Sequence, residues 1–174
     1  MGAVELLPGN GRFNHGLWAM RARCMDFSPV FALIDEAMLA YEEKRFDDEG
    51  PGWADLAPAT ELRKQDMPYQ DILQRGEPGH TADLKNSLTT HGYGSLFSIT
   101  PLTLTMGTQV SYARYHQKGF KHLGGGKVPA RPPWPDVKEL AALWRVWRGV
   151  LQDYLMGGYA AAAVSGGGIR MTSV

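Results

Sequence analysis

Cysteine is nearly absent from this sequence, since Cys24 is the only one among 174 residues. A single thiol forms no disulfide within the chain and builds no thiolate metal cluster. Long apolar runs are also missing, because no stretch approaches the roughly 20 residues that a membrane helix needs. The apolar start ends at Leu6 and Leu7, before Pro8 and Gly9, which does not fit a secretory signal. We therefore expect a chain made in the cytoplasm, without disulfides or membrane segments.

The sequence also has no excess of charge of one sign, because 18 Lys and Arg residues balance 18 Asp and Glu residues. Non-specific binding to nucleic acid draws most of its affinity from phosphate neutralisation, which usually requires a basic excess. The overall charge therefore does not favour a nucleic-acid-binding protein. A neutral chain repels its own copies only weakly, so the composition is compatible with self-association.

Motifs of catalysis are missing as well. The histidines form no helical pair with a carboxylate between them, as a zinc site would require; they are His15, His80, His91, His116 and His122. The glycine run before Lys127 lacks the spacing of a phosphate-binding loop, and Val128 stands where Ser or Thr is needed. We therefore predict that the chain is not an enzyme and that it has no catalytic residue, no metal site and no cofactor.

Helical periodicity indicates two long helices. Ser28 as an N-cap and Pro29 after it predict the start of the first, which ends in the acidic and glycine-rich run after residue 46. Asp136 predicts the N-cap of the second, which extends to about Met156. The expected apolar face of the first helix is Phe31, Ile34, Met38 and Tyr41. The expected apolar face of the second is Val137, Leu140, Trp144, Trp147, Leu151 and either Tyr154 or Leu155.

Strand structure is predicted between residues 97 and 106, where apolar residues alternate with Ser and Thr. Pro101 interrupts the alternation and marks a bend, bulge or edge position. One apolar and one Thr-rich face are typical of an antiparallel sheet that is buried on one side. Short helices are expected near Thr60 and from Thr81 to Thr90, and a surface loop from Lys121 to Arg131.

Together these elements predict an α+β fold, in which a small antiparallel β-sheet packs against two or three helices. Residues 1–26 have no clear period and are expected to form a flexible, extended N-terminal arm. Residues 27–156 are expected to form the α+β domain. Residues 157–174, which are rich in Ala and Gly, are expected to be a flexible tail or to order only against a partner.

Several short motifs follow one another along the domain. They are Trp53-x-x-Leu56-x-x-x-Thr60, Ile72-Leu73, Leu84-x-x-Ser87-Leu88, Gly107-Thr108, Tyr112-Ala113-x-x-His116-Gln117-x-Gly119 and Pro129-Ala130-Arg131-Pro132. In this order they resemble the phage virion morphogenesis family, whose members are tail-completion proteins of tailed phages. The chain departs from the family pattern in its longer N-terminal arm, in an expanded loop before Leu84 and in Pro133-Trp134-Pro135.

The resemblance implies a structural virion protein that completes the tail and helps to join it to the head, as a homo-oligomeric ring at the neck. Its partners would be copies of itself (six is one candidate number), the tail tube, and head-completion or connector proteins. DNA would pass through the lumen without sequence-specific binding, and no membrane would take part. A transient assembly adaptor or chaperone that leaves the particle is the alternative.

Five residues are candidates for subunit contacts: Tyr112, His116, Gln117, Arg131 and Trp134. We expect the first three to form a polar aromatic edge at the end of the sheet, where unpaired backbone groups invite another chain. Arg131, in its proline-rich setting, would pair with a neighbour's carboxylate at a reduced entropic cost. The alternative is that Tyr112 packs in the core of the monomer and that Arg131 binds its own C-terminal helix.

Overall fold

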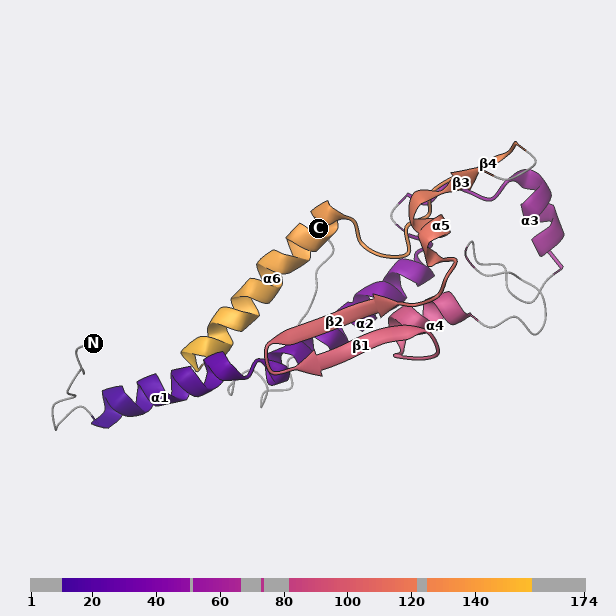
Figure 1. Ribbon diagram of the computed structural model, residues 1–174. Helices are drawn as coiled ribbons and strands as arrows, with labels where there is room; N and C mark the ends of the chain where they lie inside the picture. The colour runs from indigo at the N-terminus through magenta and orange to yellow at the C-terminus, as the bar shows by residue number, and fades with distance from the viewer. Residues whose placement is uncertain (1–10, 51, 67–72, 74–81, 122–124, 158–174) are drawn as a thin grey trace.

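A computed structural model of the chain describes residues 11–50, 52–66, 73, 82–121 and 125–157. The described residues form an elongated body with helix α1 at one end and helix α3 at the other (Figure 1). The helices of this part are α1 (Gly11–Met25), α2 (Ser28–Asp47), α3 (Pro58–Lys64), α4 (Asp83–Thr89), α5 (Ala113–Lys118) and α6 (Val137–Met156). The strands are β1 (Ser95–Thr100), β2 (Thr103–Thr108), β3 (Phe120–Lys121) and β4 (Lys127–Val128). The predicted α+β class is confirmed.

Helix α2 is the central element, and it contacts the β1–β2 hairpin, α4 and α6. Ile34 and Met38 are buried, as their spacing predicts. The prediction that Ser28 caps this helix is wrong by one position, because Phe27 is the N-cap residue and offers no side-chain acceptor. The carboxylate of Asp26 takes this role and accepts the Ser28 backbone N–H at 2.9 Å.

Strands β1 and β2 form an antiparallel hairpin whose two-residue turn contains Pro101, so the phase change in the sequence is a chain reversal. The register places Phe97 opposite Met106 and Ile99 opposite Leu104 on one face. The other face holds Leu96, Ser98, Thr100, Thr103, Thr105 and Gly107. The predicted apolar and Thr-rich faces are therefore present, but the expected burial of the apolar face is incomplete, because no residue of β1 or β2 is fully buried and Phe97 is 39% exposed. A single hairpin of this kind is marginal alone and depends on the helices that cover it.

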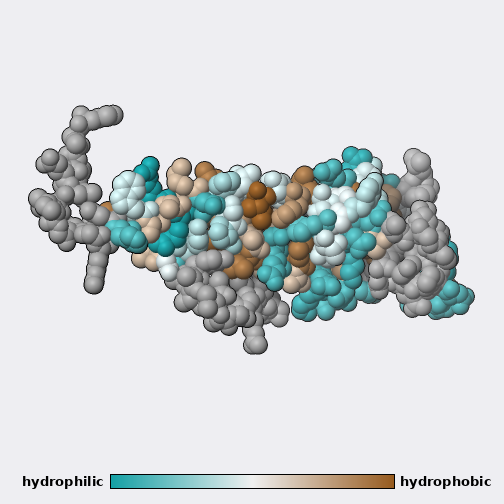
Figure 2. Space-filling model, turned by 90° about the horizontal axis from the view of Figure 1, so that it is seen from below, coloured by the Kyte–Doolittle hydropathy of each residue, from teal (hydrophilic) through white to brown (hydrophobic). Residues whose placement is uncertain are grey.

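Two clusters of buried side chains make the core. The first joins α2, α4 and the segment after α2 through Phe46, Trp53, Leu84 and Leu88. The second joins α2 to α6 through Val30, Ile34 and Tyr154. On the face seen in Figure 2, hydrophobic side chains also reach the surface along the middle of the molecule, between hydrophilic patches.

Helix α6 begins at its predicted cap. The Asp136 carboxylate accepts the backbone N–H groups of Lys138 and Glu139 at 2.8 Å, and the Glu139 carboxylate accepts the backbone N–H of Asp136 at 2.7 Å. Gly157 ends the helix in the left-handed conformation. The predicted apolar face is only partly correct, because Val137 is 83% exposed and Trp144 is 54% exposed.

Residues 11–25 are helical, so the expectation of an extended arm is wrong for this part of residues 1–26. Among residues 15–25 of α1 only Ala19 and Arg23 are half-buried, and the other side chains are exposed. These two positions are four apart and therefore share one side of the helix, and α1 packs on α6. A helix that contacts its own chain along one narrow stripe needs no apolar face, which is why periodicity did not reveal it.

The expected surface loop from Lys121 to Arg131 contains a short antiparallel hairpin instead, in which Phe120 pairs with Val128 and Lys121 with Lys127. Thr81, the expected cap of the helix before the sheet, lies outside the described residues, as does the tail from residue 158 onward. None of the helices in the described ranges combines the length and apolar character required for crossing a membrane.

Candidate subunit interface

Helix α5 and the proline-rich segment from residue 129 to 135 lie together, and they bring the five predicted contact residues into one region. The backbone N–H of Arg131 donates to the carbonyl of His116 at 2.8 Å. The Gln117 side chain donates to the Trp134 carbonyl at 3.1 Å and accepts the Trp134 N–H at 3.2 Å. The rings of Tyr112 and His116 meet edge to face with centroids 5.9 Å apart. The predicted residues are therefore neighbours, and Gln117 and Trp134 use their polar groups on each other.

Arg131 is an internal clamp. Its side chain is buried, its Nε donates to the Ala54 carbonyl at 2.6 Å, and its Nη2 donates to the Asp55 carbonyl at 2.6 Å. The Trp53 indole adds a bond to the Pro132 carbonyl at 3.1 Å. Burial lowers the pKa of Arg131 from its ordinary value. The guanidinium therefore holds the proline-rich segment against the chain after α2, and not against α6, the alternative considered for it.

Tyr112, His116 and Gln117 lie on or next to a helix and not on a strand edge, so that part of the expectation is wrong. Loss of hydration lowers the pKa of His116, and the Arg131 charge lowers it further. A neutral imidazole of this kind suits a packed position. Tyr112 is 39% exposed, so its ring is shared between the core and the surface.

Two further aromatic side chains at this end were not among the predicted contacts. Tyr115 and Phe120 are 43% and 36% exposed, and their rings meet edge to face with centroids 5.6 Å apart. The Arg114 guanidinium lies 4.7 Å from the centre of the Tyr115 ring. Exposed tyrosine, phenylalanine and arginine are enriched at protein interfaces. The sequence signal that could have identified Tyr115 is its helical spacing from Tyr112, three residues before it.

The opposite end of the molecule carries a second exposed apolar surface on α1. We call its members the arm residues; they are Leu17, Trp18, Met20 and Met25, with exposed fractions of 46%, 61%, 39% and 63%. On α6 the side chain of Trp144 is also exposed, whereas Trp147 packs against the core cluster of Val30 and Ile34. The two tryptophans of the predicted stripe therefore differ in role, and Trp144 is the one available for contact.

A buried group of charged side chains ties α2 to α6. Arg45 Nη2 donates to Glu139 Oε1 at 2.5 Å and to the Tyr41 hydroxyl at 3.0 Å. Glu42 is fully buried, and its Oε2 lies 3.8 Å from Arg45 Nε. Neither oxygen of Glu42 has a hydrogen-bond partner among the described residues. Burial is the main cause that raises the pKa of Glu42 to about 8, because the single nearby cation does not offset the lost hydration.

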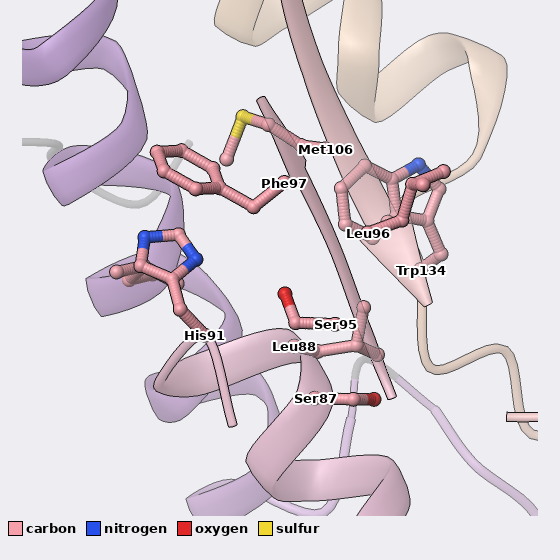
Figure 3. A pocket seen from close by; sticks show the side chains of 10 residues that line it. Ser87, Leu88, His91, Ser95, Leu96, Phe97, Met106 and Trp134 are labelled. Carbon is pink, nitrogen blue, oxygen red and sulfur yellow. The ribbon is translucent and has the colours of Figure 1, made fainter. Parts of the chain in front are cut away.

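A small cavity beside β1 is lined by His91, Phe97 and Trp134, among others (Figure 3). His91 Nε2 lies 2.8 Å from Asp35 Oδ2, and the His91 ring stacks on Phe97 with centroids 3.8 Å apart. The volume of the cavity is about 10 Å³, which is close to the minimum for one water. The cavity has no room for an organic substrate.

Within the described part of the chain, no three His, Cys, Asp or Glu side chains gather closely enough to hold a metal ion. Comparison of the chain with protein-family models, with curated proteins and with solved structures finds no match in any of the three.

Proposed function

We propose that this chain is a structural protein of a tailed phage, which completes the tail and helps to join it to the head as a ring of identical subunits at the neck. The observation that carries the proposal is α1, a helix of 15 residues that projects from the body with its arm residues exposed (Figure 1). Isolated helices of roughly this length are marginal in water, and most helical stability in proteins comes from packing. A partner that covers α1 would supply the missing contact.

The distribution of exposed apolar side chains supports a ring. The arm residues lie on α1 at one end of the long axis, and the exposed ring of Tyr112 lies at the start of α5, which is toward the other end (Figure 1). Two different surfaces on one subunit make heterologous, head-to-tail contacts, which close into a ring when the rotation between subunits permits. The resemblance of the motif order to tail-completion proteins supports the choice of the phage neck as the place of this ring.

The composition of purified particles tests the location. Mass spectrometry of virions from the phage that encodes the chain should detect it in several copies per particle. Infection without the gene should yield filled heads and separate tails. Absence from the virion, with normal head-tail joining after deletion, would refute the proposal. Absence from the virion with failed joining would favour the transient adaptor and would equally refute a place in the ring.

The contact itself is tested by sedimentation of the purified full-length chain. Wild type should form a closed oligomer. Trp18→Ala should raise the dissociation constant of that oligomer at least about tenfold and so shift the population toward monomer, as expected when a buried aromatic contact is lost. Tyr93→Ala is the matched control, because Tyr93 is 82% exposed and lies outside both surfaces. Equal behaviour of the two variants would contradict a role for α1 in the contact.

A further inference from the structure

The balanced charge of the chain conceals a separation along the sequence. Residues 84–135 contain six Lys and Arg residues and no Asp or Glu, whereas the remainder contains 12 basic and 18 acidic residues. Lys85 pairs with Asp47 at 2.7 Å, and Arg131 is the buried clamp described above. The other four cations are exposed and form no ion pair with any residue that the structure describes; they are Arg114, Lys118, Lys121 and Lys127.

The fold holds these four cations at one end of the molecule, on α5 and the β3–β4 hairpin (Figure 1). Arg114 and Lys118 are four residues apart on α5 and share one side of that helix. Lys121 lies directly opposite Lys127 in the hairpin. Gly119 joins the two elements at φ +68°, where an added Cβ would lie 2.7 Å from the Val128 carbonyl oxygen. This close passage fixes α5 against the hairpin.

Aromatic rings are interleaved with the cations. Tyr115 follows Arg114 and accepts a hydrogen bond from its guanidinium at 2.8 Å, and Phe120 lies between Lys118 and Lys121 in the sequence. We call these two rings and the four cations the basic hairpin surface. Exposed cations bind a polyanion through the charge of its phosphates, and rings between them can pack against its sugars.

Like charges directly opposite each other destabilise a hairpin, so the Lys121–Lys127 pair carries a cost that no described acidic side chain relieves. An anionic partner removes this cost. We propose that the basic hairpin surface binds the sugar-phosphate backbone of double-stranded DNA without sequence preference. The choice of duplex DNA as the polyanion rests on the proposed function, because a neck ring surrounds the path of the genome.

The experiment measures binding of the purified full-length chain to a fluorescently labelled random-sequence duplex of about 30 base pairs. Four phosphate contacts predict a slope of about −3 to −4 for the logarithm of the binding constant against the logarithm of salt concentration. Affinity should therefore fall about a hundredfold between about 50 and 200 mM NaCl. The double variant Lys118→Ala with Lys121→Ala should weaken binding at least about tenfold at the lower salt and reduce the slope by about 2.

The double variant Lys44→Ala with Lys138→Ala is the matched control, because it removes the same charge from exposed positions outside the basic hairpin surface. It should bind DNA within about twofold of wild type. The inference is overturned if wild type does not bind at about 50 mM salt, if both double variants lose the same affinity, or if neither does. It is also overturned if the Lys118 and Lys121 variant dissociates the oligomer without DNA, because the surface would then pair with another copy.

Failure of this inference and failure of the proposed function are separate results. A chain that is found in virions but does not bind the duplex keeps its place at the neck and loses only the DNA contact. A chain that binds the duplex through Lys118 and Lys121 but is absent from virions keeps the DNA contact and loses the proposed location.

Discussion

The substitution Glu42→Gln gives the sharpest prediction about stability. Glu42 is fully buried, and Arg45, the one cation close to it in the described part of the chain, is already engaged by Glu139 at 2.5 Å. Burial raises the pKa of Glu42 from its ordinary value of 4.5 to about 8. The folded state therefore binds this proton more tightly than the unfolded state does, so the stabilisation is complete below pH 4.5 and is lost as pH rises through about 8.

The size of the effect follows from the pKa difference. A shift of one pKa unit corresponds to about 1.4 kcal/mol, and pH 7 lies about 2.5 units above the unfolded pKa. Wild type should therefore lose about 3 kcal/mol of unfolding free energy between pH 4.5 and pH 7 because of this residue alone. Glutamine keeps the shape of the protonated acid and does not titrate, so Glu42→Gln should gain about 3 kcal/mol over wild type across the same interval.

Urea denaturation of both proteins at pH 5, 6, 7 and 8 provides the measurement. Glu43→Gln is the control, since Glu43 is the next residue in α2 and is exposed. The difference between wild type and Glu42→Gln should widen with pH, whereas the difference for Glu43→Gln should stay nearly constant. Parallel pH profiles for wild type and Glu42→Gln would show that Glu42 is ionised in the folded protein and would refute the reasoning.

Three further predictions concern local structure. Arg131→Ala removes two charge-assisted hydrogen bonds to the carbonyls of Ala54 and Asp55, which are exposed residues, and should reduce the unfolding free energy by about 1 to 3 kcal/mol in urea titrations. A loss below about 0.5 kcal/mol would contradict the clamp. Asp136→Ala removes the capping box of α6 and should lower the unfolding free energy by about 1 kcal/mol in thermal unfolding. Asp136→Asn should stay close to wild type, and equal losses of stability in the two variants would argue against capping. Gly50→Ala should prevent folding as judged by circular dichroism, because the added Cβ would lie 2.2 Å from the Trp53 ring. The added Cβ of Gly52→Ala would meet no atom within 4 Å, so this variant should cost only the backbone strain of about 1 kcal/mol. Similar stability of the two glycine variants would contradict this packing.

The parts of the fold that sequence predicted correctly depend on residues close together in the chain. Asp136 and Glu139 form a capping box over three residues, and Leu84 and Leu88 share one face of α4 and are both buried. The hairpin faces follow from simple alternation, because each strand exposes alternate residues to the helices. Such patterns need no knowledge of distant partners.

The candidate site could be located from the sequence but its chemistry could not. The motif order brought Tyr112 and Trp134 to attention, and the structure places them in one region. The acceptors of Arg131 are backbone carbonyls 76 and 77 residues away, and backbone carbonyls carry no residue-specific pattern. Overall composition also hid the basic hairpin surface, because a sum over the chain cannot show where charges lie.

The single stripe through which α1 contacts α6 has a consequence for measurement. Among residues 15–25 of α1 only Ala19 and Arg23 are half-buried, so opening of this part requires little loss of packing. Its amides should therefore exchange with deuterium much faster than those of α2 in the isolated subunit. Contact with a neighbour would slow this exchange in α1 and leave the α2 core unchanged. The helix is therefore a natural reporter, and the time course of its protection would follow assembly of the particle without any added label.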